Sequence, residues 1–151
     1  MDELTLYLQS TEYYAEYKLE QILNEKIIIT DDHIKNIDFN YYESDLGFNI
    51  ITLFEKYGYV FTNNDYILLV SKSGSTIKYI SEDKQTNKIC KTAVKQYGFA
   101  LEFISDDKKT NEICKMAVLR NKTALCYVPD IIKHVYLHKM NIISINDLWS
   151  I

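Results

Sequence analysis

Hydrophobic positions recur with the period of an α-helix in the second half of the chain. Between residues 87 and 97, apolar side chains follow one another at intervals that place them on one helix face. A shorter apolar segment covers residues 99–104, and polar residues 105–108 end it. The pattern predicts a long helix, a tight turn, a short helix and an acidic turn. The inward face of the long helix consists of Ile89, Cys90, Ala93, Val94 and Tyr97.

The residues at the ends of the long helix agree with this prediction. Thr86 or Asn87 is expected to cap its start, because both side chains accept hydrogen bonds from the N–H groups of a first turn. Gly98 is expected to end it in the left-handed conformation, which glycine adopts without steric cost.

The same unit occurs twice in succession. Residues 79–102 and 103–126 align without a gap and share 13 identities in 24 positions. A degenerate copy over residues 55–78 shares four identities with residues 79–102. In the last copy Asn121-Lys122 replaces Tyr97-Gly98, so one of the two has to adopt the left-handed conformation, which Asn tolerates better.

A single unit of this kind cannot bury its own apolar face, whereas stacked units form a continuous core. We therefore expect an all-α fold in which short helical hairpins stack as a small solenoid. The chain is expected to be one domain over residues 1–151. Residues 1–54 form an N-terminal helical cap, 55–128 three repeats with the first degenerate, and 129–151 a C-terminal cap. Cys90 and Cys114 should then lie in equivalent layers.

Further elements are expected in the two flanks. We expect one helix over residues 2–24 and a strand or buried connector over 27–30. A helix start is expected at residues 31–33, a loop over 40–47 and a helix over 48–57. Residues 131–138 are expected to extend the last short helix, and residues 142–151 to close the stack. The inward side chains of the first helix would be Leu4, Leu8, Ala15, Leu19, Ile22 and Leu23, and those of the last segment Leu148 and Trp149.

The repeated stretches resemble a family of unknown function that occurs in giant viruses and intracellular bacteria. The matching segments are Tyr79-Ile80-Ser81-Glu82, Ile89-Cys90-Lys91-Thr92-Ala93-Val94 and Tyr97-Gly98-Phe99-Ala100-Leu101, with their second-copy equivalents. The resemblance covers about residues 62–128. It implies a helical repeat of about two dozen residues and a virus or intracellular parasite as source, and it implies no catalytic residue.

Composition excludes several classes of function. The 151 residues carry 17 Lys and Arg against 21 Asp and Glu, a net charge of −4, and Arg120 is the single arginine. Nucleic-acid binding is therefore not expected, although a local basic patch is compatible with an acidic total. The three cysteines lack CxxC spacing, so we expect no disulfide framework, and they favour a cytoplasmic location. If the protein is viral, this location would be the host cytoplasm, with the virion as the alternative. The sequence has neither a basic leader nor an apolar run of about 18 residues. We therefore expect neither export by a standard signal nor a membrane span.

One combination of residues has partial metal-site chemistry. Cys114, Cys126, His134 and His138 give C-x11-C-x7-H-x3-H, with both histidines on one helix face. However, Cys90 fills the same repeat position as Cys114 with no histidine nearby in sequence, and zinc fingers place their cysteines closer together. A Cys126–histidine nucleophile is the other chemical interpretation, against a thiol packed beneath residues 131–151. We expect no metal, cofactor or catalytic residue.

Acidic pairs and tyrosines also fit structural roles. Glu82-Asp83 and Asp106-Asp107 recur with the repeat and are expected to be solvated turns, and His33 to be a first-turn helix residue. The tyrosines around Tyr13 and Tyr41 are expected to pack in the core, with partner contact as the alternative for exposed ones.

The expected function is a non-enzymatic protein–protein interaction module that binds a host or viral protein. Solenoids work by presenting a long, rigid surface, and the repeat positions of Lys91, Lys95, Lys115 and Leu119 would line it. The first alternative is a structural subunit of a virion or assembly, self-associating through an uncapped end near Trp149. A small enzyme is the second alternative.

The predicted inward face can be tested with Ala117→Leu. The larger side chain should overpack the helix interface and lower the free energy of unfolding by about 1–3 kcal/mol. Chemical denaturation measures the change. An unaltered stability would show that Ala117 does not face a neighbouring helix.

Overall fold

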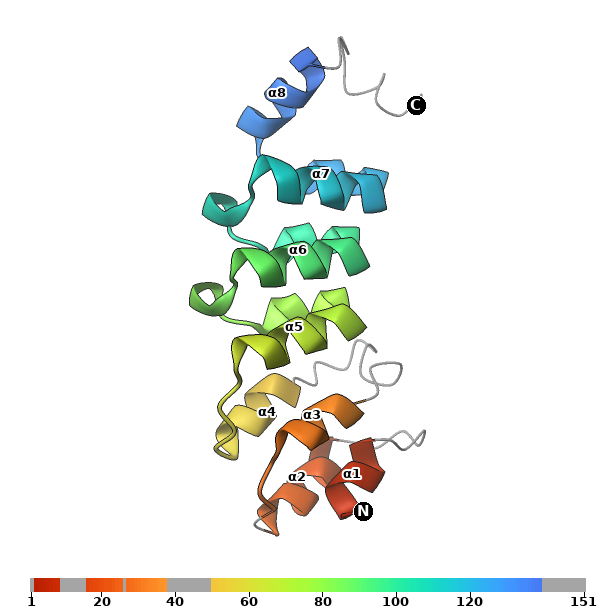
Figure 1. Ribbon diagram of the computed structural model, residues 1–151, viewed down its shortest axis with the longest axis vertical. Coiled ribbons are helices and arrows are strands. Elements are labelled where there is room, and N and C mark those ends of the chain that lie inside the picture. Colours follow the sequence, from red (N-terminus) through yellow and green to blue (C-terminus); the bar gives the residue numbers. More distant parts are fainter. Residues whose placement is uncertain (1, 9–15, 26, 38–49, 140–151) are drawn as a thin grey trace.

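The computed structural model describes residues 2–8, 16–25, 27–37 and 50–139, and these residues form an all-α structure (Figure 1). No strand occurs among them. The α-helices are α1 (Glu3–Leu8), α2 (Glu16–Asn24), α3 (Asp31–Asn36), α4 (Ile50–Lys56), α5 (Asn63–Lys72), α6 (Asn87–Gln96), α7 (Asn111–Arg120) and α8 (Asp130–Lys139). The 3-10 helices are η1 (Gly74–Tyr79), η2 (Glu82–Lys84), η3 (Gly98–Phe103), η4 (Asp106–Lys108) and η5 (Lys122–Tyr127).

An α-helix followed at once by a 3-10 helix is the recurring pair of residues 63–127, as α5–η1, α6–η3 and α7–η5. Figure 1 shows α5, α6 and α7 in successive layers along the longest axis. Each of these helices contacts the next, and η1, η3 and η5 contact one another in the same order. The short helices are 3-10 helices, whose three residues per turn align Gly98, Leu101 and Ile104 on one buried side.

Equivalent residues of the units have the same surroundings. Cys90 and Cys114 are both fully buried, and each thiol lies 3.8 Å from the backbone oxygen five residues earlier, that of Gln85 or Lys109. The predicted cap is confirmed at Thr86, whose hydroxyl accepts from the first turn of α6. Thr62 and Thr110 cap α5 and α7 in the same way.

Gly98 has a different role from the one predicted. It is not left-handed, and among the described residues positive φ occurs at Gly58 (φ 87°). Gly98 starts η3 against the C-terminal end of α7, where an added Cβ would lie 2.6 Å from the Ala117 carbonyl oxygen. Gly74 approaches α6 in the same way, 2.5 Å from the Ala93 oxygen. Close approach of backbones, not conformational freedom, therefore requires glycine here.

The prediction that Asn121 or Lys122 adopts the left-handed conformation is also wrong. Asn121 is extended (φ −140°, ψ 109°) and its side-chain oxygen accepts from the Gly98 N–H at 3.0 Å. Lys122 occupies the repeat position of Gly98 but is exposed, with no further copy of the unit packed on it. A side chain is tolerated there because the close approach does not recur.

Side chains at the C-termini of the α-helices link each layer to the preceding one. Gln96 donates to the Lys72 carbonyl at 3.3 Å, and Arg120 donates through Nε to the Gln96 carbonyl at 3.1 Å. Lys72 donates to the carbonyl of Ile37, just after α3, at 2.9 Å. Consecutive donors in this series are 24 residues apart. They satisfy carbonyls that a helix terminus leaves without an intrahelical partner.

The N-terminal segment differs from the single helix predicted for residues 2–24. It contains α1 and α2, which pack against each other, an arrangement that one straight helix forbids. The inward side chains Leu4, Leu8 and Leu19 are buried as predicted, together with Ile22 and Leu23. Ala15 lies outside the described residues.

His33 joins two of these helices. Its Nδ1 accepts from the Thr30 N–H at 2.9 Å at the start of α3, and its Nε2 lies 3.2 Å from both carboxylate oxygens of Asp2. His33 is only 4% exposed. The hydrogen bond from the Thr5 backbone, with the contact to His33, lowers the pKa of Asp2 to about 2. The residue expected to be an ordinary first-turn histidine therefore ties α3 to α1.

Other flank predictions have mixed outcomes. The helix start at residue 31 and the helix within 48–57 are confirmed by α3 and α4. Residues 27–30 form an extended connector without strand pairing, with Ile29 buried and Ile28 82% exposed. Residues 131–138 do not extend η5, because Pro129 separates it from α8. Residues 40–47 and 142–151, with Trp149, lie outside the described part.

The glycine contact predicts a strong positional effect. Gly98→Ala should lower the free energy of unfolding by about 1–3 kcal/mol, because its Cβ would overlap the Ala117 carbonyl oxygen. Lys122→Ala is the matched control, at the same repeat position without the close neighbour, and should change it by less than about 0.5 kcal/mol. Urea denaturation compares the two. Equal effects would contradict the packing explanation.

Candidate interaction surfaces

The residues whose spacing partly resembles a metal site do not form a metal-binding group in the described part of the chain. Cys114 is buried in α7, whereas Cys126 is exposed on η5 and His134 is exposed on α8. The side chain of His138 lies outside the described residues. Among the described side chains, no group of three or more His, Cys, Asp or Glu is arranged to hold a metal ion.

Cys126 is an exposed thiol, so the interpretation that it packs beneath residues 131–151 is wrong. The repeat explains its position, because Lys78 and Glu102, its equivalents on η1 and η3, are also exposed. Burial raises the pKa of the Cys90 thiol, and that of Cys114 to about 11. Both buried thiols are therefore protonated at neutral pH and are not nucleophiles.

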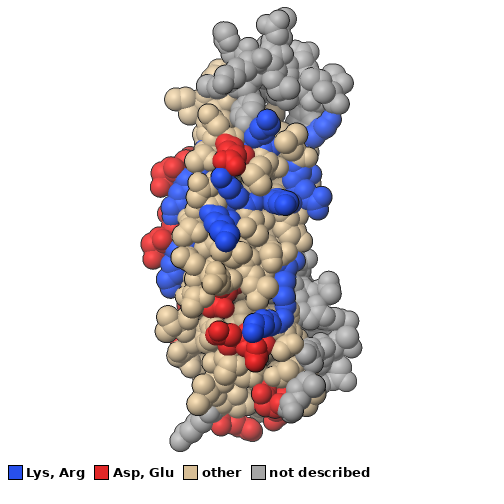
Figure 2. Space-filling model, in the orientation of Figure 1, with Lys and Arg blue, Asp and Glu red and all other residues tan. Residues whose placement is uncertain are grey.

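The outward side of α6 and α7 is rich in cations. Lys88 and Lys95 are seven residues apart on α6, opposite the buried Ala93, and Lys115 is exposed on α7. Arg120 adds a fourth cation near the end of α7. We call this set, Lys88, Lys95, Lys115 and Arg120, the basic face. Figure 2 shows Lys and Arg gathered where α6 and α7 lie, with Asp and Glu mostly at the left edge and toward the lower end.

The basic face reflects a charge asymmetry that the whole-chain total conceals. Residues 1–65 contain four basic and 13 acidic residues, a net charge of −9, whereas residues 66–133 contain 12 basic and seven acidic residues, a net charge of +5. Sequence reasoning missed this because it used the overall charge of −4. Counting charge separately for the repeats and for the preceding segment would have found it.

Lys91, which is predicted to line a contact face, also takes part in a contact between layers. Lys91 is half-buried and pairs with Glu112 of α7 at 2.6 Å, so it links two layers. Lys95, Lys115 and Leu119 are exposed as that prediction requires, and Leu119 is 76% exposed. The predicted contact surface would therefore combine cations with one prominent apolar side chain, Leu119.

The acidic turns lie at the edge of the repeats. Glu82, Asp83, Asp106 and Asp107, on η2 and η4, are all exposed, as expected for solvated connectors. Lys108 donates to the Glu82 carbonyl and so joins the two turns.

The 3-10 helices present aromatic side chains. Phe99 contacts Tyr97 and Tyr127, with ring centroids 5.5 Å and 6.3 Å apart. Tyr97 is 39% and Phe103 36% exposed. The prediction that Tyr97 lies on the inward face of the long helix is therefore wrong, because α6 ends at Gln96 and Tyr97 follows it in extended conformation. Partly exposed aromatic residues are common in protein interfaces, so this side is a second candidate contact surface.

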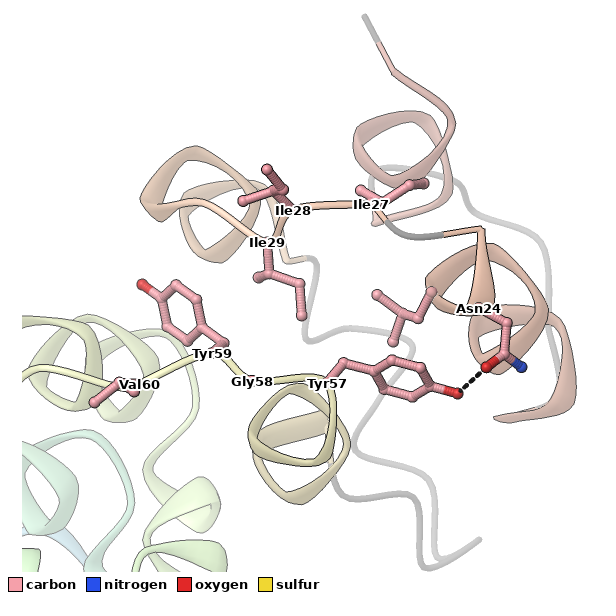
Figure 3. Close-up of a pocket in the computed structure, with 9 residues that line it drawn as sticks. Asn24, Ile27, Ile28, Ile29, Tyr57, Gly58, Tyr59 and Val60 are labelled. Carbon is pink, nitrogen blue, oxygen red and sulfur yellow. Dashed lines mark hydrogen bonds between the residues drawn. The ribbon is translucent and has the colours of Figure 1, made fainter.

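A groove lies between the N-terminal helices and the segment after α4. It encloses about 650 Å³ and includes Ile28 and Val60, each 82% exposed. Figure 3 shows the Tyr57 hydroxyl directed at Asn24, to which it donates at 2.9 Å. The groove is apolar for most of its length. Its lining is Leu23, Asn24, Ile27, Ile28, Ile29, Tyr57, Gly58, Tyr59 and Val60.

Comparison with known proteins finds a similarity between the repeats and an uncharacterised family. The profile of a domain of unknown function (DUF4116) matches residues 66–107 and again residues 87–133. No curated protein and no solved structure matches the chain. Within the described residues, no helix combines the length and apolar character needed to cross a bilayer.

The accessibility of the three thiols is directly measurable. With Ellman's reagent at neutral pH, the native chain should react rapidly at Cys126 alone, because Cys90 and Cys114 are buried and protonated. In denaturant all three should react. Cys126→Ser should remove the rapid native reaction, and its persistence in that variant would show that the repeat interior opens.

Proposed function

We propose that the protein is a non-enzymatic protein–protein interaction module. In this proposal residues 55–128 act as a small solenoid of helical repeats, with residues 1–54 and 129–151 as its caps, within one domain. The repeats serve as a rigid support, and their outward side chains select the partner. Rigid surfaces bind at a low cost in conformational entropy.

The observation that supports this proposal is that the buried positions of α6 and α7 are alike, while three of their exposed positions differ between the two helices. Ile89 and Ile113, like Cys90 and Cys114, are identical and buried. Three outward positions differ in chemistry. Lys88 of α6 corresponds to Glu112 of α7, Lys95 corresponds to Leu119, and Gln96 corresponds to Arg120. Packing alone accounts for the identity of the buried residues. A binding module additionally needs exposed side chains that differ from unit to unit.

The source and setting of the protein form a second part of the proposal. The resemblance of the repeats to proteins of giant viruses and intracellular bacteria supports a role in infection, with a host or viral protein as the partner and the host cytoplasm as the location.

A structural subunit of a virion or multi-protein assembly is the second candidate function. It is favoured by Ile131, which is 77% exposed on α8 near the end of the described chain. Exposed apolar side chains of this size contribute to association surfaces. This alternative requires a mass in solution that rises with protein concentration, which sedimentation measures.

A surface exchange between units tests the proposed module. The variant Lys88→Glu/Lys95→Leu/Gln96→Arg gives α6 the outward residues of α7, all of which the fold already accommodates one layer away. Thermal stability should change by no more than about 0.5 kcal/mol per substitution. Affinity capture from infected-cell lysate should lose partners that wild type retains. Capture of an identical set of proteins would contradict a role for this surface.

A further inference from the structure

We propose that the basic face of α6 and α7 binds an acidic segment of a partner protein, one that also carries an apolar side chain. This inference rests on the proposed function and names the chemistry of its partner. It is carried by the cations of the basic face, the exposed Leu119 one turn after Lys115 on α7, and the contacts between the two helices.

The cations are not neutralised by the protein itself. Lys88, Lys95 and Lys115 are exposed and form no ion pair among the described side chains. The acidic group on the outward side of α7, Glu112, is already paired with Lys91. The positive potential of the surface is therefore available to an anionic partner.

An apolar contact is available beside these charges. Leu119 takes the repeat position of Lys95 and is 76% exposed, and Met116, one turn earlier on α7, is half-buried. A partner with carboxylates alone would leave Leu119 in water. A partner with one apolar side chain among its carboxylates would cover it and gain burial energy.

The spacing of the two helices is fixed from both ends. Arg120 donates to the Gln96 carbonyl at their C-termini, and Lys91 pairs with Glu112 nearer their N-termini. The cations are therefore presented by preorganised helices, which limits the ordering cost of binding to their side chains.

The observations favour an acidic protein segment over a nucleic acid. The net charge of −9 on residues 1–65 repels a long polyanion that extends beyond the repeats. The basic face also lacks an aromatic side chain on which bases stack. A short segment that contacts α6 and α7 alone avoids the acidic end.

The test measures the fluorescence anisotropy of a labelled peptide of glutamates interrupted by leucine, with a matched peptide in which glutamine replaces glutamate. The acidic peptide should bind, more weakly as salt rises from about 50 to about 300 mM. Lys88→Glu/Lys95→Glu should weaken binding by about tenfold or more. The control Lys78→Glu/Lys122→Glu makes the same change in net charge on η1 and η5 and should weaken it by less than about threefold.

Several results would overturn the proposal. These are equal losses in the two variants, equal binding of the glutamine peptide, or tighter binding of a charge-matched oligothymidylate. Doubling of the solution mass in a way that Lys88→Glu/Lys95→Glu abolishes would instead identify the acidic end of a second copy as the occupant. If a charge-reversed variant fails to fold by circular dichroism, Lys88→Gln/Lys95→Gln replaces it. A surface exchange that alters capture while the acidic peptide fails to bind would leave the module intact and refute only its acidic partner.

Discussion

The backbone contacts of η1 with the end of α6, and of η3 with the end of α7, are the constraint on which the repeated part depends. Gly74 meets the Ala93 carbonyl, and Gly98 meets the Ala117 carbonyl, at distances that leave no room for a Cβ. Small residues at both partners allow the layers to approach until their backbones touch. Alanine, cysteine and isoleucine then fill the space that remains between layers. The same contact thus recurs at the 24-residue spacing of the sequence repeat.

The close spacing of the layers also determines which side chains contact a neighbouring layer and which stay exposed to solvent. The donors at the helix C-termini reach the preceding layer only because the helices are near one another, as Gln96 and Arg120 demonstrate. Lys95 and Leu119, on the outward sides of α6 and α7, are exposed, so packing constrains their chemistry little. Lys95 and Leu119 differ for this reason, while Ala93 and Ala117 do not.

The sequence predicted the features that depend on local periodicity and on repetition. The all-α class, the cap at the start of α6 and its buried face, apart from Tyr97, followed from residue spacing and internal identity. The role of Gly98 did not, because a sequence shows which conformations glycine permits but not which backbone lies beside it. The division into α1 and α2, and the contact of His33 with Asp2 across 31 residues, depend on tertiary packing that no periodicity encodes. The basic face was readable from sequence but was hidden by averaging charge over the chain.

The charge asymmetry and the repeat together limit how a partner can approach. A ligand that follows the whole length of the molecule would meet cations over α6 and α7 and then the acidic surroundings of α1 to α3. Attraction at one end and repulsion at the other favour a compact contact and oppose an extended one. Because each unit presents a different set of outward residues, lateral displacement of a partner by one layer would replace Lys95 with Leu119 or Ser71. In the proposed module, a repetitive support with non-repetitive charge would therefore fix the register of the partner as well as its location.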